Sequence, residues 1–77
     1  MRVEFSQGTI IVTPHEIVVR LTQMPETVLQ AQQEAVTLFG QTANVIMANV
    51  GGVKWSLKLD TLEQLTLISE QLGCEIR

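Results

Sequence analysis

Cysteine, histidine and aromatic residues are scarce in this 77-residue sequence, which has one cysteine, one histidine, one tryptophan, two phenylalanines and no tyrosine. A single cysteine excludes an internal disulfide, and one cysteine with one histidine offers few of the ligands that a zinc site needs. The three aromatic side chains fall at positions that we expect to be buried, so they offer no platform for stacking nucleic-acid bases. We therefore expect no metal ion and no cofactor.

Basic residues are also few, since five lysines and arginines stand against eight acidic residues and give a net charge of −3 and a pI of about 4.9. This balance disfavours sequence-independent binding to nucleic acid or to an anionic membrane surface. No apolar run approaches the ~18 residues of a transmembrane helix, and the N-terminal residues lack the pattern of a signal peptide. We expect a cytoplasmic protein with neither a nucleic-acid nor a membrane partner.

Hydrophobic residues, by contrast, make up 45% of the chain, which indicates a folded core rather than disorder. No linker or low-complexity segment divides the sequence, so residues 1–77 are predicted to form a single domain. A domain of this size buries a modest share of its surface. Without a disulfide or a metal site, self-association is the remaining common way to stabilise it.

The clearest local signal is Gly51-Gly52, which lies between two runs rich in β-branched residues. Two consecutive glycines accept positive φ at both central positions of a tight hairpin turn. Such a turn opposes residues that share one apolar face. The predicted pairs are Val50 with Val53, Ala48 with Trp55, and Ile46 with Leu57.

A helix is predicted to follow this hairpin. Asp60 is a suitable N-cap, Glu63 completes a capping box, and Gly73 supplies the left-handed stop. Residues 74–77 are long enough for a short last strand only. The helical spacing predicts a buried stripe of Leu62, Leu65, Ile68 and Leu72, widened by Leu67.

Residues 1–22 are predicted to form a three-stranded meander with turns at Gln7-Gly8 and Pro14-His15. The first turn pairs Phe5 with Ile10, and a bulge at Gly8 that shifts this pairing by one residue is the alternative. Both turns place the same apolar residues on one face. These residues are Val3, Phe5, Ile10, Val12, Ile17 and Val19.

Residues 23–39 are predicted to form a second helix, with Pro25 in its first turn and Gly40 at its end. Its apolar stripe consists of Val28, Ala31, Ala35 and Leu38. The segment 35–39 is also compatible with a strand. The whole pattern predicts an α+β fold of order βββ-α-ββ-α-(β), in which two helices pack on one face of an antiparallel sheet.

No residue set predicts catalysis. His15 lies in an expected exposed turn without a positioned partner, and Cys74 follows the C-terminal end of a helix, where the dipole does not favour a thiolate. Lys54 and Lys58 alternate on one strand, which is typical of a soluble outer face, with anion binding as the alternative. We therefore predict that the protein is not an enzyme.

Two apolar pairs lie on predicted outer faces. Ile11 is opposed to Val18 on the first, and Val45 stands beside Met47 on the second. Such pairs suit a two-fold contact, so we predict a homodimer through one of these patches or through a strand edge. Alternatively, a helix or the second hairpin covers the first pair, or the outer faces cover each other within one chain.

With its VTPHEIVVRL and GGVKWSLKL hairpins, the chain resembles short uncharacterised bacterial proteins that consist of a domain of unknown function. This resemblance implies no activity and no functional residue. We expect a small cytoplasmic protein-interaction or structural module that self-associates, and a small-ligand-binding or regulatory domain is the alternative.

Overall fold

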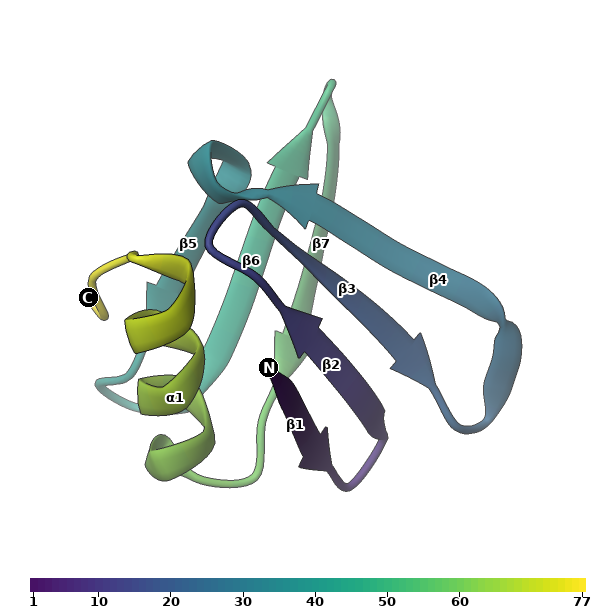
Figure 1. The fold of residues 1–77 in the computed structure, drawn as a ribbon, viewed down its shortest axis with the longest axis horizontal. Coiled ribbons are helices and arrows are strands. Elements are labelled where there is room, and N and C mark those ends of the chain that lie inside the picture. The colour runs from purple at the N-terminus through teal and green to yellow at the C-terminus, as the bar shows by residue number, and fades with distance from the viewer.

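The computed structural model describes all 77 residues, which form two antiparallel sheets and one α-helix (Figure 1). A four-stranded sheet has the order β1-β2-β3-β4 and a three-stranded sheet has the order β5-β6-β7. A short 3-10 helix, η1, joins the sheets, and α1 follows the last strand. The bounds are β1 Arg2–Phe5, β2 Gly8–Val12, β3 Glu16–Leu21, β4 Met24–Gln32, η1 Gln33–Ala35, β5 Val36–Phe39, β6 Val45–Val50, β7 Val53–Lys58 and α1 Leu62–Leu72.

The inner faces of both sheets and one side of α1 enclose a single core. The four-stranded sheet lies in front in Figure 1, its strands run obliquely across the three-stranded sheet, and α1 lies at one side of both. The core contains 16 buried hydrophobic residues and no buried polar side chain. Its fully buried members include Ile10, Val12, Ile17, Val19, Leu38, Ile46, Leu65 and Ile68.

The predicted second helix is wrong, because residues 24–32 and 36–39 are strands and only residues 33–35 form a short 3-10 turn. Leu29 and Ala31 are opposed to Val19 and Ile17 and face the core, while the residues between them face outward. The sequence of β4 fits both an alternating strand pattern and a helical spacing, and it forms a strand because it pairs with β3. Pro25 is tolerated because β4 is an edge strand. The fold is therefore two sheets with one helix, not one sheet covered by two helices, and the strand alternative for residues 35–39 holds from Val36.

The Gly51-Gly52 hairpin is confirmed with the predicted register, since Ala48 is opposed to Trp55 and Ile46 to Leu57. The φ angles of Gly51 and Gly52 are 56° and 86°. Both values lie in the region that glycine adopts without a steric penalty, as a primed hairpin turn requires.

The first hairpin has the predicted face but a different register. Phe5 is opposed to Gly8 and Val3 to Ile10, so the turn consists of Ser6 and Gln7. The pairing differs from the predicted one by two residues, and a shift of two returns every side chain to the same face. Neither the predicted turn nor the one-residue bulge at Gly8 is present, because buried Gly8 begins β2 instead of turning the chain.

The helix begins one residue later than predicted. Thr61 is the N-cap and forms a capping box with Gln64, so Asp60 and Glu63 do not have the expected roles. Leu65, Ile68 and Leu72 are buried as predicted, whereas Leu62 is 53% exposed. Gly73, with φ of 78°, ends the helix in the left-handed conformation. The last residues form one parallel bridge, between Leu38 and Ile76.

Candidate interaction surfaces

The chain itself blocks two of the four sheet edges. At the β1 edge, Gln64 Nε2 donates to the carbonyl oxygen of Glu4 at 2.9 Å, and the Ser6 amide donates to Asp60 Oδ2 at 2.7 Å. At the β5 edge, the Arg77 amide donates to the carbonyl oxygen of Leu38 at 2.8 Å. The remaining edge strands, β4 and β7, each pair with a neighbour on one side only. These two edges are therefore open to another chain.

Asp60 joins the first hairpin to the start of α1. Its Oδ1 accepts a hydrogen bond from the Ser6 hydroxyl at 2.6 Å, in addition to the amide bond to Oδ2. The Ser6 hydroxyl, and next the Ser6 amide, hold the pKa of Asp60 below its ordinary value of 3.8; desolvation opposes this and Gln64 adds to it. Hydrogen bonds of this kind favour the ionised carboxylate in the folded state.

We expect Asp60→Asn to reduce the loss of stability in acid. A carboxylate with a lowered folded-state pKa stabilises the fold above its unfolded-state pKa, and this contribution is lost as the pH falls through the folded-state pKa. Urea midpoints measured at pH 6 and at about pH 3 should therefore differ less in the variant than in the wild type. Glu63→Gln is the control, because this exposed acid makes no hydrogen bond to the rest of the fold. If the urea midpoint fell by the same amount in acid for the wild type and for Asp60→Asn, the contacts between Ser6 and Asp60 would be contradicted.

The outer face of the four-stranded sheet carries an uncovered apolar cluster, which we call the β2–β4 patch and define as Ile11, Val18 and Val28. Ile11 is 40% exposed, Val28 is 48% exposed and Val18 is half-buried. Ile11 and Val18 are directly opposed, as predicted, and Val28 on β4 lies diagonally beside Val18. Neither a helix nor the second hairpin covers the pair. Sequence reasoning missed Val28 because it assigned this residue to a helix, although alternation along β4 places it here.

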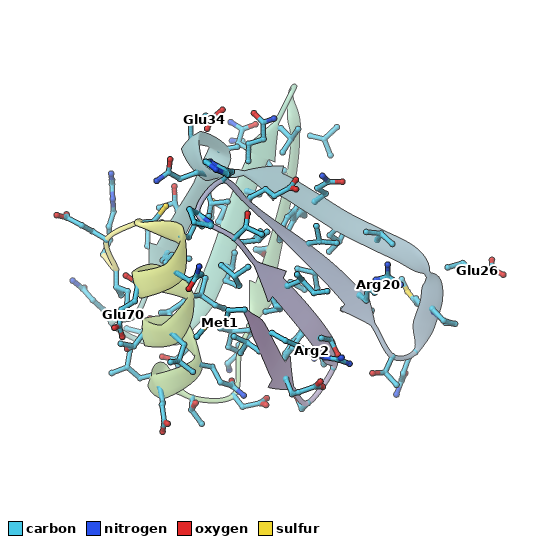
Figure 2. All side chains as sticks on the ribbon, viewed as in Figure 1. Met1, Arg2, Arg20, Glu26, Glu34 and Glu70 are labelled. Atoms are coloured by element: carbon cyan, nitrogen blue, oxygen red, sulfur yellow. The ribbon has the colours of Figure 1, made fainter.

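Charges of both signs surround the β2–β4 patch. Arg2 and Glu4 form an ion pair in which Nε and Oε1 are 2.9 Å apart, and Gln30 Nε2 donates to Glu16 Oε1 at 2.6 Å. Arg20 is opposed to Val28 and also lies on this face. In Figure 2, Arg2 and Arg20 both project from the sheet that faces the viewer. The rim can therefore pair with a copy of itself.

The outer face of the three-stranded sheet, here the cationic face, has a different character. Phe39, Val45 and Lys58 are directly opposed in one row, and Met47 lies in the next row. Met47 and Phe39 are each 37% exposed and Val45 is half-buried. The expected burial of Phe39 was wrong, because its strand begins at Val36 and alternation then turns Leu38 inward and Phe39 outward.

The charges of the chain are distributed unevenly between the two sheets. Residues 36–59, which contain β5 to β7, include two lysines and no acidic residue, so they carry +2. The rest of the chain has three arginines and eight acidic residues and carries −5. Figure 2 labels Glu26, Glu34 and Glu70 on β4, η1 and α1, which are not strands of this sheet. The three-stranded sheet is therefore cationic although the molecule as a whole has a net charge of −3.

His15 and Cys74, which were weighed for chemistry, each share a hydrogen bond with Gln33, but no hydrogen bond joins their side chains. His15 is exposed in the β2–β3 turn, where its amide donates to Thr13 Oγ1 at 3.2 Å. Half-buried Cys74 donates from Sγ to the carbonyl oxygen of Gln33 at 3.7 Å, and burial raises the pKa of its thiol. No group of three or more histidine, cysteine or acidic side chains lies together. The surface hollows are partly open to solvent, and one of 390 Å³ is lined by Phe39, Gln41, Thr42, Ala43, Val45 and Arg77.

The helix α1 has 11 residues, and no helix of this protein has the length and apolar character needed to cross a membrane. No curated protein and no solved structure matches the chain. One family profile does match, over residues 1–76, and its description is a protein of unknown function, DUF3389. The match confirms the resemblance to a domain of unknown function. With nearly its whole length covered, the chain belongs to the DUF3389 family of proteins of unknown function.

Proposed function

We propose that this protein is a small interaction module that forms a homodimer through the β2–β4 patch. The observation that supports the proposal is an apolar cluster from three adjacent strands, Ile11, Val18 and Val28, which no element of the chain covers. An apolar cluster ringed by polar residues is typical of a protein–protein contact surface. In a two-fold dimer the patch meets its own copy.

The charges favour this patch over the pair Val45 and Met47. Around Ile11, both signs are available, so an arginine of one copy can approach a glutamate of the other. On the cationic face, a two-fold contact would bring Lys54 and Lys58 against their own copies without an acidic residue from β5 to β7 to compensate. Like charges opposed across an interface disfavour association.

Such a contact would add to the stability of this small chain. A standard interface buries about 800 Å² on each partner, which is roughly a sixth of the 4960 Å² of accessible surface. Burial of the three apolar side chains would also extend a small core, which has neither a disulfide nor a metal site to stabilise it.

We expect Ile11→Glu to convert the dimer to a monomer, because it places two carboxylates against each other at the centre of the two-fold contact. The dimer dissociation constant should rise by roughly tenfold or more, since removing a central contact residue commonly costs at least 1–2 kcal/mol. Sedimentation velocity at micromolar concentrations measures this change directly.

Met47→Glu is the matched control. Met47 is 37% exposed and Ile11 40%, and each lies on a strand that pairs on both sides, so the two substitutions differ mainly in which sheet they affect. The control should remain dimeric. A wild-type protein that is monomeric at these concentrations, or an Ile11→Glu variant with unchanged mass, would overturn the proposal.

The proposal is for a binding role, not a catalytic one, and it places the protein in the cytoplasm of a bacterial cell. It is supported by the exposed position of His15, which has no positioned partner for its side chain, and by the unpaired cysteine, which suits a reducing compartment. The alternative of a small-ligand-binding domain is less well supported, because a typical ligand site is an enclosed apolar pocket and the hollows of this surface are open.

A further inference from the structure

The free edge of β7 has a defined hydrogen-bonding pattern. In a hairpin with a two-residue turn, the residues that flank the turn bond to each other, and bonded pairs then alternate with unbonded pairs. The amide of Leu59 donates to the carbonyl oxygen of Asn44 at 2.7 Å, which agrees with this pattern at the far end. The amides and carbonyls of Lys54, Ser56 and Lys58 therefore point away from β6. They have no partner within the chain.

The side chains on this edge separate into two rows. Lys54, Ser56 and Lys58 project on the cationic face, whereas Val53, Trp55 and Leu57 project on the core side. Along the core-side row, burial decreases from Leu57 at 9% exposed, through half-buried Trp55, to Val53 at 65% exposed. A strand laid along this edge would thus meet lysines with one set of alternate side chains and apolar surface with the other.

The lysines select among possible strands. Lysine on an edge strand hinders pairing with a second copy of the same strand, because like charges then lie side by side. It favours an incoming strand that carries acidic residues on the same face. No acidic residue of β5 to β7 neutralises these lysines from within the sheet.

We propose that the edge of β7 binds an extended acidic segment of a partner protein by β-strand addition. The segment alternates acidic and apolar residues, so that its carboxylates lie beside Lys54 and Lys58 and its apolar side chains cover Val53 and Trp55. Main-chain hydrogen bonds to residues 54, 56 and 58 hold the segment, and the side-chain rows provide the specificity. This site is on the opposite sheet from the proposed dimer contact, so it remains accessible in the dimer.

Trp55 is the only tryptophan, so the tryptophan fluorescence of the protein comes from this edge and can detect binding there. The probe is a capped heptapeptide of alternating glutamate and valine, titrated while the tryptophan fluorescence is recorded at low salt. We expect saturable binding that weakens as the salt concentration rises, because exposed charges are screened within ~10 Å at 0.1 M. Two control peptides are an alternating lysine–valine heptapeptide and a block peptide with the same glutamates and valines but no alternation. Neither should bind comparably.

Protein variants separate the charge from the edge. The double variant Lys54→Glu/Lys58→Glu should bind the glutamate–valine peptide roughly tenfold more weakly and should bind the lysine–valine peptide instead. Ser56→Pro removes one outward amide without removing a bond to β6, and proline is tolerated on an edge strand. It should abolish binding, whereas Ser56→Thr, which keeps the amide, should bind normally.

Two peptides, one methylated on its glutamate amides and one on its valine amides, test the same bonds without changing the protein, and one of them should lose binding while the other keeps it, because successive amides of a strand point to opposite edges. The proposal would be overturned by equal binding of the alternating and block peptides or by unchanged affinity in the double lysine variant. It would also be overturned if Trp55 responded to a single-stranded oligonucleotide and not to the glutamate–valine peptide.

Discussion

Leu65→Asp should leave the chain unfolded at 25 °C. Leu65 has no exposed surface and lies among the residues of α1 that close the core between the two sheets. The substitution removes roughly 1.5–3 kcal/mol of hydrophobic burial and adds the cost of placing a carboxylate where it has no partner. Domains have about 0.05–0.15 kcal/mol of stability per residue, which is roughly 4–12 kcal/mol for a chain of this size. Far-UV circular dichroism and the dispersion of amide NMR signals would show the loss of folded structure.

Leu67→Asp is the matched control on the same helix. Leu67 is 37% exposed and does not belong to the core cluster. Helix propensity and net charge change equally in the two variants, so burial of the substituted side chain separates them. We expect Leu67→Asp to fold with a loss of about 1 kcal/mol or less. A folded Leu65→Asp protein would mean that α1 does not close the core as described.

Gly8→Ala should destabilise the fold by at least about 3 kcal/mol, which is beyond the usual range for overpacking. A Cβ atom at Gly8 would lie 1.9 Å from the carbonyl oxygen of Arg20 and 3.0 Å from the Cα of Leu21. Both are backbone atoms of β3, so no side-chain rotation relieves the contact. The strands must separate at the place where the pairing of β3 with β4 also shifts, between Arg20 and Leu21. Urea denaturation would give the change in unfolding free energy.

Gly51→Ala provides the comparison for this variant. A Cβ atom there has no atom within 4 Å, but the φ of Gly51 is 56°. The left-handed conformation costs a non-glycine residue roughly 1–2 kcal/mol. Gly8 is not among the residues with positive φ, so its substitution tests close approach of the backbone rather than strain. If Gly8→Ala were less harmful than Gly51→Ala, the tight contact between β2 and β3 would be disproved.

Local chemistry was sufficient to predict the second hairpin. Gly51-Gly52 and the alternation on both sides of it specify a turn and a register without reference to the rest of the chain. The stop at Gly73 and the burial of Leu65 and Ile68 were also predictable, because they depend on residues within one helix. The opposed pair Ile11 and Val18 follows from the turn at Pro14-His15, which is equally local.

The start of the helix shows where local signals were ambiguous. Asp60 and Thr61 are both good N-cap residues, and each stands three residues before a Glu or Gln. Asp60 does not cap the helix because Ser6, which lies 54 residues away in the sequence, donates hydrogen bonds to both of its carboxylate oxygens. Thr61 was then left to cap the helix with Gln64.

The sequence by itself determined which residues are apolar, that tight turns lie at Pro14-His15 and Gly51-Gly52, and that the outer strand faces carry apolar pairs. Only the tertiary structure decided that residues 24–32 form a strand. Their sequence fits both a helical and an alternating pattern, and hydrogen bonding to β3 stabilises the strand. The same strand brought Val28 beside Val18 and completed the β2–β4 patch. The open edge of β7 likewise depends on strand order, since which edges are covered is decided by distant segments such as Gln64 and Arg77. Sequence patterns report on neighbours along the chain, whereas surfaces are made by neighbours in space.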